Sequence, residues 1–191
     1  MFNERKVGQQ AVYLLFKTDR RSMTRMKLMK LLYLADREAI NQLGAPISGD
    51  RLVSMPLGPC LSTTLNLING SRPSSADGWD SMLRNSNDDW RDVVALLGPP
   101  TEGDLSFYDE LSRAELKILD EIWVAYGHMT AGQLVDWTHE NLPEWIDPGS
   151  SSSPISVSEI GQALGLEPDE VEQITSALAE RDALRKMLAN A

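Results

Sequence analysis

The chain has 191 residues, of which 42% are hydrophobic and 24% are charged, with a formal net charge of −10. These proportions fit a globular domain with a substantial core, and no apolar run approaches the ~20 residues of a membrane-spanning helix. The acidic excess would repel a phosphate backbone, so nucleic acid is a disfavoured partner.

The single cysteine, Cys60, excludes an internal disulfide, and residues 1–10 lack the apolar run of a secretory signal. We therefore expect a cytoplasmic protein that does not associate with membranes. The charge is uneven, since residues 1–37 hold nine Lys or Arg against three Asp or Glu. This basic end is interpreted first as a solvated helix surface and second as a patch for an acidic partner.

Apolar periodicity predicts two helices at the start of the chain. Residues 5–18 place apolar side chains on one face (Val7, Ala11, Leu14 and Leu15). Residues 24–43 predict a second helix, capped by Thr24 and ended by Gly44. Its apolar side chains, with Leu28, Leu31 and Leu32 foremost, cover most of the circumference. A helix of this kind is expected to be the buried centre of the fold.

A rigid turn follows this helix. Residues 50–55 are short and suited to an extended conformation, and Pro56-Leu57-Gly58-Pro59 then fixes a tight bend. Residues 62–69 predict another helix. Residues 71–89 are polar and predict irregular structure, with one helical turn around residues 79–83.

Strand signals appear in the middle of the chain. Residues 90–97 and 104–108 flank a segment rich in glycine and proline, residues 98–103. This pattern predicts an antiparallel hairpin, with residues 51–55 as a candidate third strand.

Helix signals dominate the remainder. Capping boxes begin at Ser112, Thr130 and Ser156, and Pro168 opens a last helix. Residues 148–154 predict a flexible connection. We expect a mainly α (α+β) fold around the central helix, organised as residues 1–148 and a C-terminal helical hairpin, residues 149–191, packed on the same domain.

Several motifs fall in an order typical of one family. Residues 26–62 contain Lys-Leu-Met-Lys-Leu-Leu-Tyr, ending at Tyr33, and then the Gly58-Pro59 turn. Leu-Ser-Arg-Ala-Glu (residues 111–115), Tyr-Gly (126–127) and a Leu-x-x-x-Thr-His segment ending in Pro-x-Trp (134–145) follow. Residues 24–147 thus resemble the Panacea antitoxin domain of SocA-like antitoxins and phage-associated relatives. Cys60 and the polar segment 71–89 depart from that pattern.

The resemblance implies a protein-binding module that neutralises a co-encoded toxin by forming a complex with it. Family toxins belong to many unrelated classes, so the partner's class stays open. A phage-associated role, or an adaptor that delivers its partner to a protease, is the alternative that the resemblance suggests. Whether the chain forms a homodimer is also open.

The residues themselves disfavour catalysis. The sequence has no Gly-x-Ser-x-Gly elbow, Walker-type loop or Gly-x-Gly-x-x-Gly fingerprint. His139-Glu140 begins like a zinc-binding helix, but Pro143 stands where the second histidine is required. With His128 and Cys60 as the other soft ligands, we expect no enzyme, no metal and no cofactor.

Two polar residues, Asp36 and His139, have structural interpretations. Asp36 lies among apolar residues and needs a partner if it is buried, with the backbone, Arg37 or Arg51 as candidates. His139, between Trp137 and Trp145, is expected to be packed and hydrogen-bonded.

Residues 159–174 have the spacing of a helix-turn-helix. Their would-be recognition helix begins with acidic residues (Asp169, Glu170 and Glu172), which would repel phosphates. A plain helical hairpin is therefore preferred to a DNA-binding regulator.

A partner-binding patch is predicted around the turn. Lys30, Tyr33 and Arg37 recur at helical spacing, and Tyr and Arg are enriched at interfaces. The segment that should pack beside them adds further residues (Arg51, Met55, Leu57, Gly58 and Pro59). A rigid turn loses little entropy on binding. The alternative is that Tyr33 belongs to the core and the turn is only structural.

Overall fold

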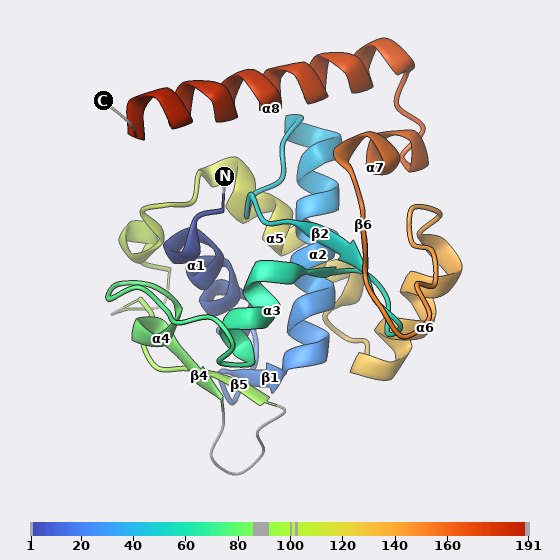
Figure 1. Ribbon diagram of the computed structural model, residues 1–191. Helices are drawn as coiled ribbons and strands as arrows, with labels where there is room; N and C mark the ends of the chain where they lie inside the picture. The colour runs from blue at the N-terminus through green and yellow to red at the C-terminus, as the bar shows by residue number, and fades with distance from the viewer. Residues whose placement is uncertain (1, 86–91, 100, 102, 190–191) are drawn as a thin grey trace.

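Helix α2 (Arg25–Leu43) runs through the centre of the molecule, and the other elements surround it (Figure 1). The computed structural model describes residues 2–85, 92–99, 101 and 103–189. The other helices within these residues are α1 (Glu4–Leu15), α3 (Ser62–Ile68), α4 (Trp79–Met82), the 3-10 helix η1 (Leu105–Tyr108), α5 (Arg113–Tyr126), α6 (Ala131–Asn141), α7 (Val157–Ala163) and α8 (Pro168–Ala189).

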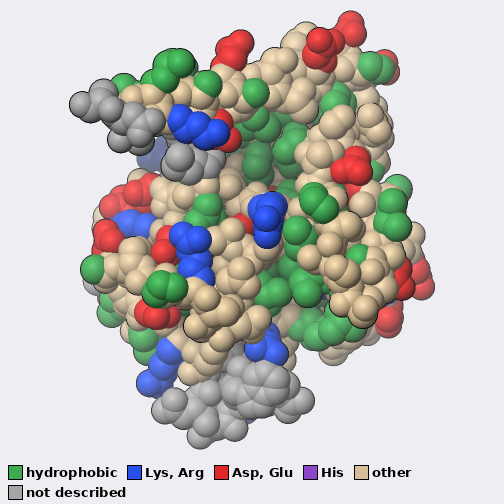
Figure 2. All heavy atoms as spheres, viewed as in Figure 1, with side chains coloured by type: hydrophobic (Ala, Val, Ile, Leu, Met, Phe, Trp, Pro, Cys, Tyr) green, Lys and Arg blue, Asp and Glu red, His purple; other side chains and the backbone are tan. Residues whose placement is uncertain are grey.

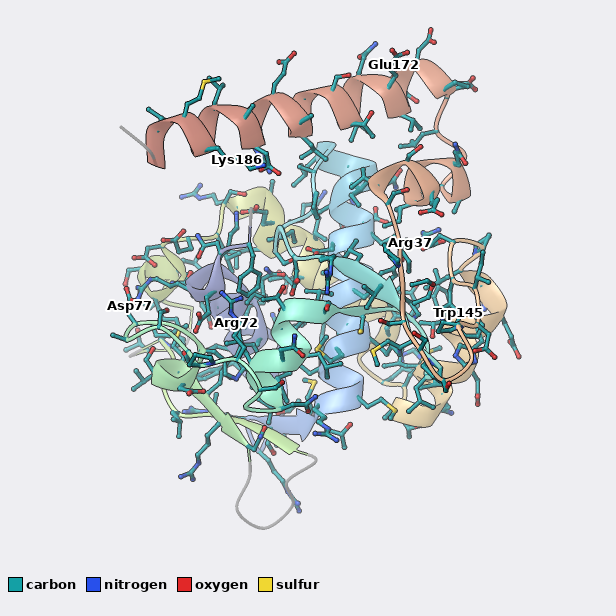
Figure 3. The ribbon with its side chains drawn as sticks, viewed as in Figure 1. Arg37, Arg72, Asp77, Trp145, Glu172 and Lys186 are labelled. Atoms are coloured by element: carbon teal, nitrogen blue, oxygen red, sulfur yellow. The ribbon has the colours of Figure 1, made fainter. Side chains whose placement is uncertain are left out.

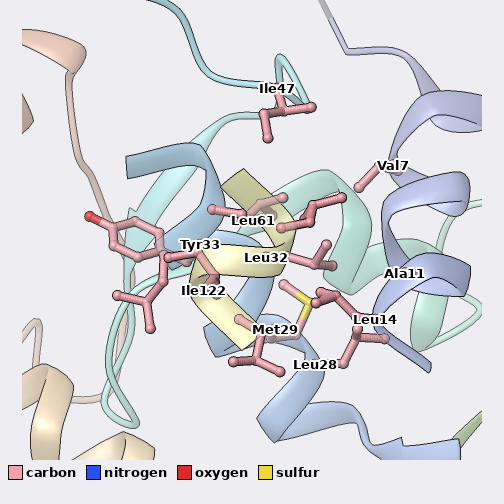
Figure 4. Close-up of a cluster of buried hydrophobic side chains, with 14 of the residues drawn as sticks. Val7, Ala11, Leu14, Leu28, Met29, Leu32, Tyr33, Ile47, Leu61 and Ile122 are labelled. Carbon is pink, nitrogen blue, oxygen red and sulfur yellow. The ribbon is translucent and has the colours of Figure 1, made fainter. Parts of the chain in front are cut away.

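Helix α2 is buried, as predicted. The Thr24 side chain accepts a hydrogen bond from the Lys27 amide at 3.4 Å, and Gly44 ends the helix with a left-handed φ of 68°. Leu28, Leu31 and Leu32 are completely buried. Figure 4 shows side chains of α1 and α2 meeting Ile47, Leu61 and Ile122 in this core. Burial on all sides explains why α2 lacks a distinct polar face.

The first small sheet corrects the predicted hairpin. Strand β5 (Asp92–Ala95) pairs antiparallel with β1 (Ser22–Thr24) and β4 (Leu83–Asn85). The second predicted strand, residues 104–108, is wrong, because Leu105–Tyr108 form η1, which Asp104 caps. The actual partners span only three residues each, too short for a period-two pattern to reveal them. The part of the predicted strand before residue 92 lies outside the described residues.

The second sheet has the order β3-β2-β6, formed by Cys60–Leu61, Leu52–Ser54 and Ser153–Pro154. Residues 51–55 therefore do not join the first sheet. Part of the segment predicted to be a flexible connection forms the edge strand β6, in which Pro154 pairs with Val53. An edge position tolerates proline, because the amide that proline lacks would not have been needed for the ladder.

The C-terminal helices follow the predicted signals. All three capping boxes, beginning at Ser112, Thr130 and Ser156, are present in the structure. Helix α7 packs against both α2 and α8, and α8 lies across the end of the molecule (Figure 1). The division of the chain at residue 148 stays a prediction. Within the part of the chain that is described, no helix combines the length and apolarity needed to cross a bilayer.

Candidate functional site

The Pro56–Pro59 turn is held between α2 on one side and residues 138–146, from the end of α6 onwards, on the other. Figure 3 labels Arg37 and Trp145, which come from these two flanking segments and lie on the same side of the molecule. The contacts below show that motifs separated by about a hundred positions in the sequence meet at this turn. We refer to this assembly as the turn site.

Gly58 lies close to the side chains of Lys30 on α2 and Thr138 on α6. Its φ of 92° lies in the left-handed region, and an added Cβ would stand 2.6 Å from Lys30 Nζ and 2.7 Å from Thr138 Oγ1. Any other residue would clash there and would also strain the backbone. The Lys30 ammonium donates a 2.9 Å hydrogen bond to the carbonyl of Pro59, so it supports the turn from below.

Trp145 holds the turn from the opposite side. Its indole Nε1 donates a 2.9 Å hydrogen bond to the carbonyl of Met55, and the amide of Ile146 donates to Ser54 Oγ at 3.3 Å. The His139 ring stacks on Trp145 with centroids 3.9 Å apart and planes inclined by 8°. The predicted packing of His139 is confirmed, but its buried Nε2 has no hydrogen-bond partner among the residues that the structure describes.

A buried ion pair fastens the same segment to α2. Glu144 Oε1 accepts hydrogen bonds from Arg37 Nε at 2.8 Å and from the Tyr33 hydroxyl at 3.1 Å. The Glu144 side chain is completely buried. Burial, followed by the neighbouring Glu144 charge, raises the pKa of Tyr33 far above its usual value, so this hydroxyl remains a donor. Glu144 is not among the predicted site residues, and its only signal in the sequence is its place between the proline and tryptophan of the Pro-x-Trp motif.

Asp36 does not pair with either candidate arginine. It is completely buried and accepts hydrogen bonds from the backbone amide of Ser48 at 2.9 Å and from the Ser48 hydroxyl. Burial raises the pKa of Asp36 to about 7. Arg37 pairs with Glu144 instead, and Arg51 donates to Ser62 Oγ at 3.1 Å. The backbone alternative was correct, and both arginine alternatives were wrong.

An apolar hollow opens beside the turn. Its volume is about 380 Å³, and its lining includes three methionines, Met26, Met29 and Met55, together with Leu57 and Lys30. Figure 2 shows hydrophobic side chains gathered where α2, α3 and the turn meet, with Lys or Arg side chains nearby. Figure 3 shows sulfur atoms beside the first turns of α2. We refer to this feature as the methionine hollow.

The comparison with protein families decides how these motifs are to be understood. Residues 28–146, well over half of the chain, match the family model described as Antitoxin SocA-like, Panacea domain. The chain belongs to this family. The Panacea match spans α2 from Leu28 onwards, the turn and the Pro-x-Trp segment, so the whole turn site lies within the domain. Neither the curated proteins nor the solved structures give a significant match.

The predicted interface residues divide into two groups in this Panacea domain. Lys30 and Tyr33 are 3% and 0% exposed, so they do not belong to the exposed part of the predicted patch, and the alternative that Tyr33 is a core residue is confirmed. Both lie inward because α2 is enclosed on all sides. Arg51 and Leu57 are exposed, Met55 and Arg37 are half-buried, and Gly58 and Pro59 are buried. Trp137 packs edge-on against Tyr126 with centroids 4.8 Å apart.

Proposed function

We propose that the protein neutralises a co-encoded toxin by binding it directly at the turn site, and that it is a binding module without catalytic activity. The antitoxin family to which the chain belongs supports the first part. The absence of nucleophile and phosphate-loop motifs from the sequence supports the second. Among the residues that the structure describes, no three His, Cys, Asp or Glu side chains are grouped as metal ligands.

The turn site is chosen as the binding surface because it presents an exposed apolar residue on a turn that is held firmly in place. Leu57 is 54% exposed, although the turn is anchored through Lys30 below it and Trp145 beside it. Ile146, next to Trp145, is 70% exposed. Preorganised apolar groups bind with little further loss of entropy, and such groups commonly form the centre of a protein interface.

The test is co-expression with the co-encoded toxin, scored by growth. Leu57→Asp and Ile146→Asp place a carboxylate in the proposed interface and should abolish rescue, because an unpaired buried charge is costly. Val124→Asp is the matched control, since Val124 is 80% exposed on α5 and should tolerate the change. Each variant is first shown to melt as the parent does.

If both interface variants rescue growth as well as the parent does, the toxin does not bind at the turn site. A parent chain that fails to rescue would overturn the proposed neutralisation itself. Measuring binding of the purified proteins separates a loss of affinity from a loss of expression.

A further inference from the structure

Lys30 is a buried cation for which the described residues supply no anion. It is 3% exposed, and its hydrogen bond to the Pro59 carbonyl is its only one within the described parts of the chain. An ammonium group has three donors, so two remain unused. Carboxylates form ion pairs with Lys6, Lys17 and Arg37, but no carboxylate in the described part of the chain does so with Lys30. Burying a charge without a counter-ion costs free energy, so a lysine at this buried position requires an explanation.

Lys30 is also part of the lining of the methionine hollow, where the charge balance differs from that of the whole chain. The lining contains two cations, Arg25 and Lys30, and no Asp or Glu among its described residues. The whole chain has 28 acidic against 18 basic side chains. The hollow therefore combines apolar walls with local positive charge in a molecule whose net charge is −10.

We infer that the methionine hollow receives an apolar segment of the toxin that carries a carboxylate, and that Lys30 binds this carboxylate. This inference rests on the proposed function, since it names the chemistry of the partner at the same site. The walls would hold the apolar side chains, and the unused ammonium donors would form a charge-assisted hydrogen bond with the acidic group.

Two further observations favour a protein segment as the occupant. Leu57 lines the hollow and is 54% exposed, so the apolar lining reaches the open surface, where a partner's segment can cover it. Methionine side chains are flexible and fit irregular surfaces, which suits a partner's packed side chains. Burial lowers the pKa of Lys30 to about 8, so the ammonium form still predominates at neutral pH.

The test uses a pair of peptides rather than the toxin. Acetyl-Leu-Leu-Glu-Leu-amide and its Gln twin are titrated into the full chain carrying carbon-13 on the methionine methyl groups. The methyls of Met26, Met29 and Met55 should shift, whereas those of Met82 and Met187, which do not line the hollow, should not. The Glu peptide should bind about tenfold more tightly than its twin, the scale expected for one charged hydrogen bond.

Two substitutions then test the role of Lys30. Lys30→Met removes the charge at similar volume, and Lys30→Gln retains a donor for the Pro59 carbonyl if the first variant folds poorly. Both should abolish the preference for the Glu peptide. Lys117→Met is the matched control, because Lys117 is 71% exposed and pairs with Glu121 on the surface of α5.

Equal binding of the two peptides, no binding at millimolar concentration, or a preference that survives in both Lys30 variants would overturn the inference. Because these measurements involve no toxin, their failure is distinct from a failure of neutralisation. In the co-expression assay, a parent chain that rescues growth together with a Lys30→Met variant that rescues equally well would contradict the inference alone.

Discussion

The Trp145 indole donates a hydrogen bond to the Met55 carbonyl across 90 positions of sequence. This contact joins the Pro-x-Trp motif to the residue that precedes the Pro56–Pro59 turn. Together with the Glu144 ion pair to Arg37, it fixes the segment after α6 against α2. Two motifs that are separate in the sequence therefore form one structural unit.

Trp145→Phe should destabilise the protein by about 1 kcal/mol, the typical net value of one hydrogen bond, plus a smaller loss of packing. Chemical denaturation measures this difference in the free energy of unfolding. Trp137→Phe is the matched control, because Trp137 is also half-buried but contacts Tyr126 through ring packing. Equal losses in the two variants would show that the bond to Met55 contributes nothing specific.

Glu144→Ala should cost about 3–5 kcal/mol, since it leaves the Arg37 guanidinium and the Tyr33 hydroxyl without their buried acceptor. Lys117→Ala breaks an exposed ion pair with Glu121 and should change the free energy of unfolding by less than about 0.5 kcal/mol. Urea unfolding of both variants provides the comparison. A loss below about 1 kcal/mol for Glu144→Ala would contradict the structural role assigned to this residue.

Leu32→Ala should cost about 2–5 kcal/mol, because Leu32 is completely buried in the centre of α2 and its truncation leaves a cavity. Val124→Ala, at a position that is 80% exposed, should stay within about 0.5 kcal/mol of the parent. Thermal or urea unfolding distinguishes the two. Similar values for both would mean that α2 is not the buried centre of the fold.

Asp36 should make stability depend on pH in the direction opposite to an ordinary ion-paired carboxylate. Burial, opposed by hydrogen bonds from Ser48, raises its pKa from 3.8 to about 7, and the nearby Asp50 charge adds to the increase. Between these values the folded state holds a proton that the unfolded state has lost. The contribution of Asp36 is therefore fully present below about pH 4 and is lost as the pH rises towards 7.

The measurement is the difference in free energy of unfolding between the parent and Asp36→Asn from pH 4 to pH 7. Because the other carboxylates are the same in both proteins, their pH-dependent contributions to stability largely cancel in this difference. The parent should lose stability relative to the variant by up to about 1.4 kcal/mol per pH unit. A constant difference across this range would show that Asp36 is not titrating as the structure indicates.

The sequence determined the α-helices of this protein, because their signals are local, whereas the short 3-10 helix η1 was mistaken for a strand. Helix α2 begins after Thr24 and ends before Gly44, as predicted. The three capping boxes begin α5, α6 and α7. Caps and apolar spacing act within a few residues, so they can be recognised without the rest of the fold. The Pro56–Pro59 turn was likewise evident from residues with restricted or permissive backbones.

Only the tertiary structure decided which distant residues meet. Within the basic N-terminal part, Arg5, Lys6, Lys17 and Arg37 pair with carboxylates between residues 109 and 144, partners that the local sequence did not reveal. Strand β5 pairs with β1 and β4, which are too short to show the alternating apolar pattern of a strand. Lys30 and Tyr33, polar in the sequence, were turned inward. Strand pairing, ion pairing and burial depend on the packing of whole elements, which the local spacing of residues does not encode.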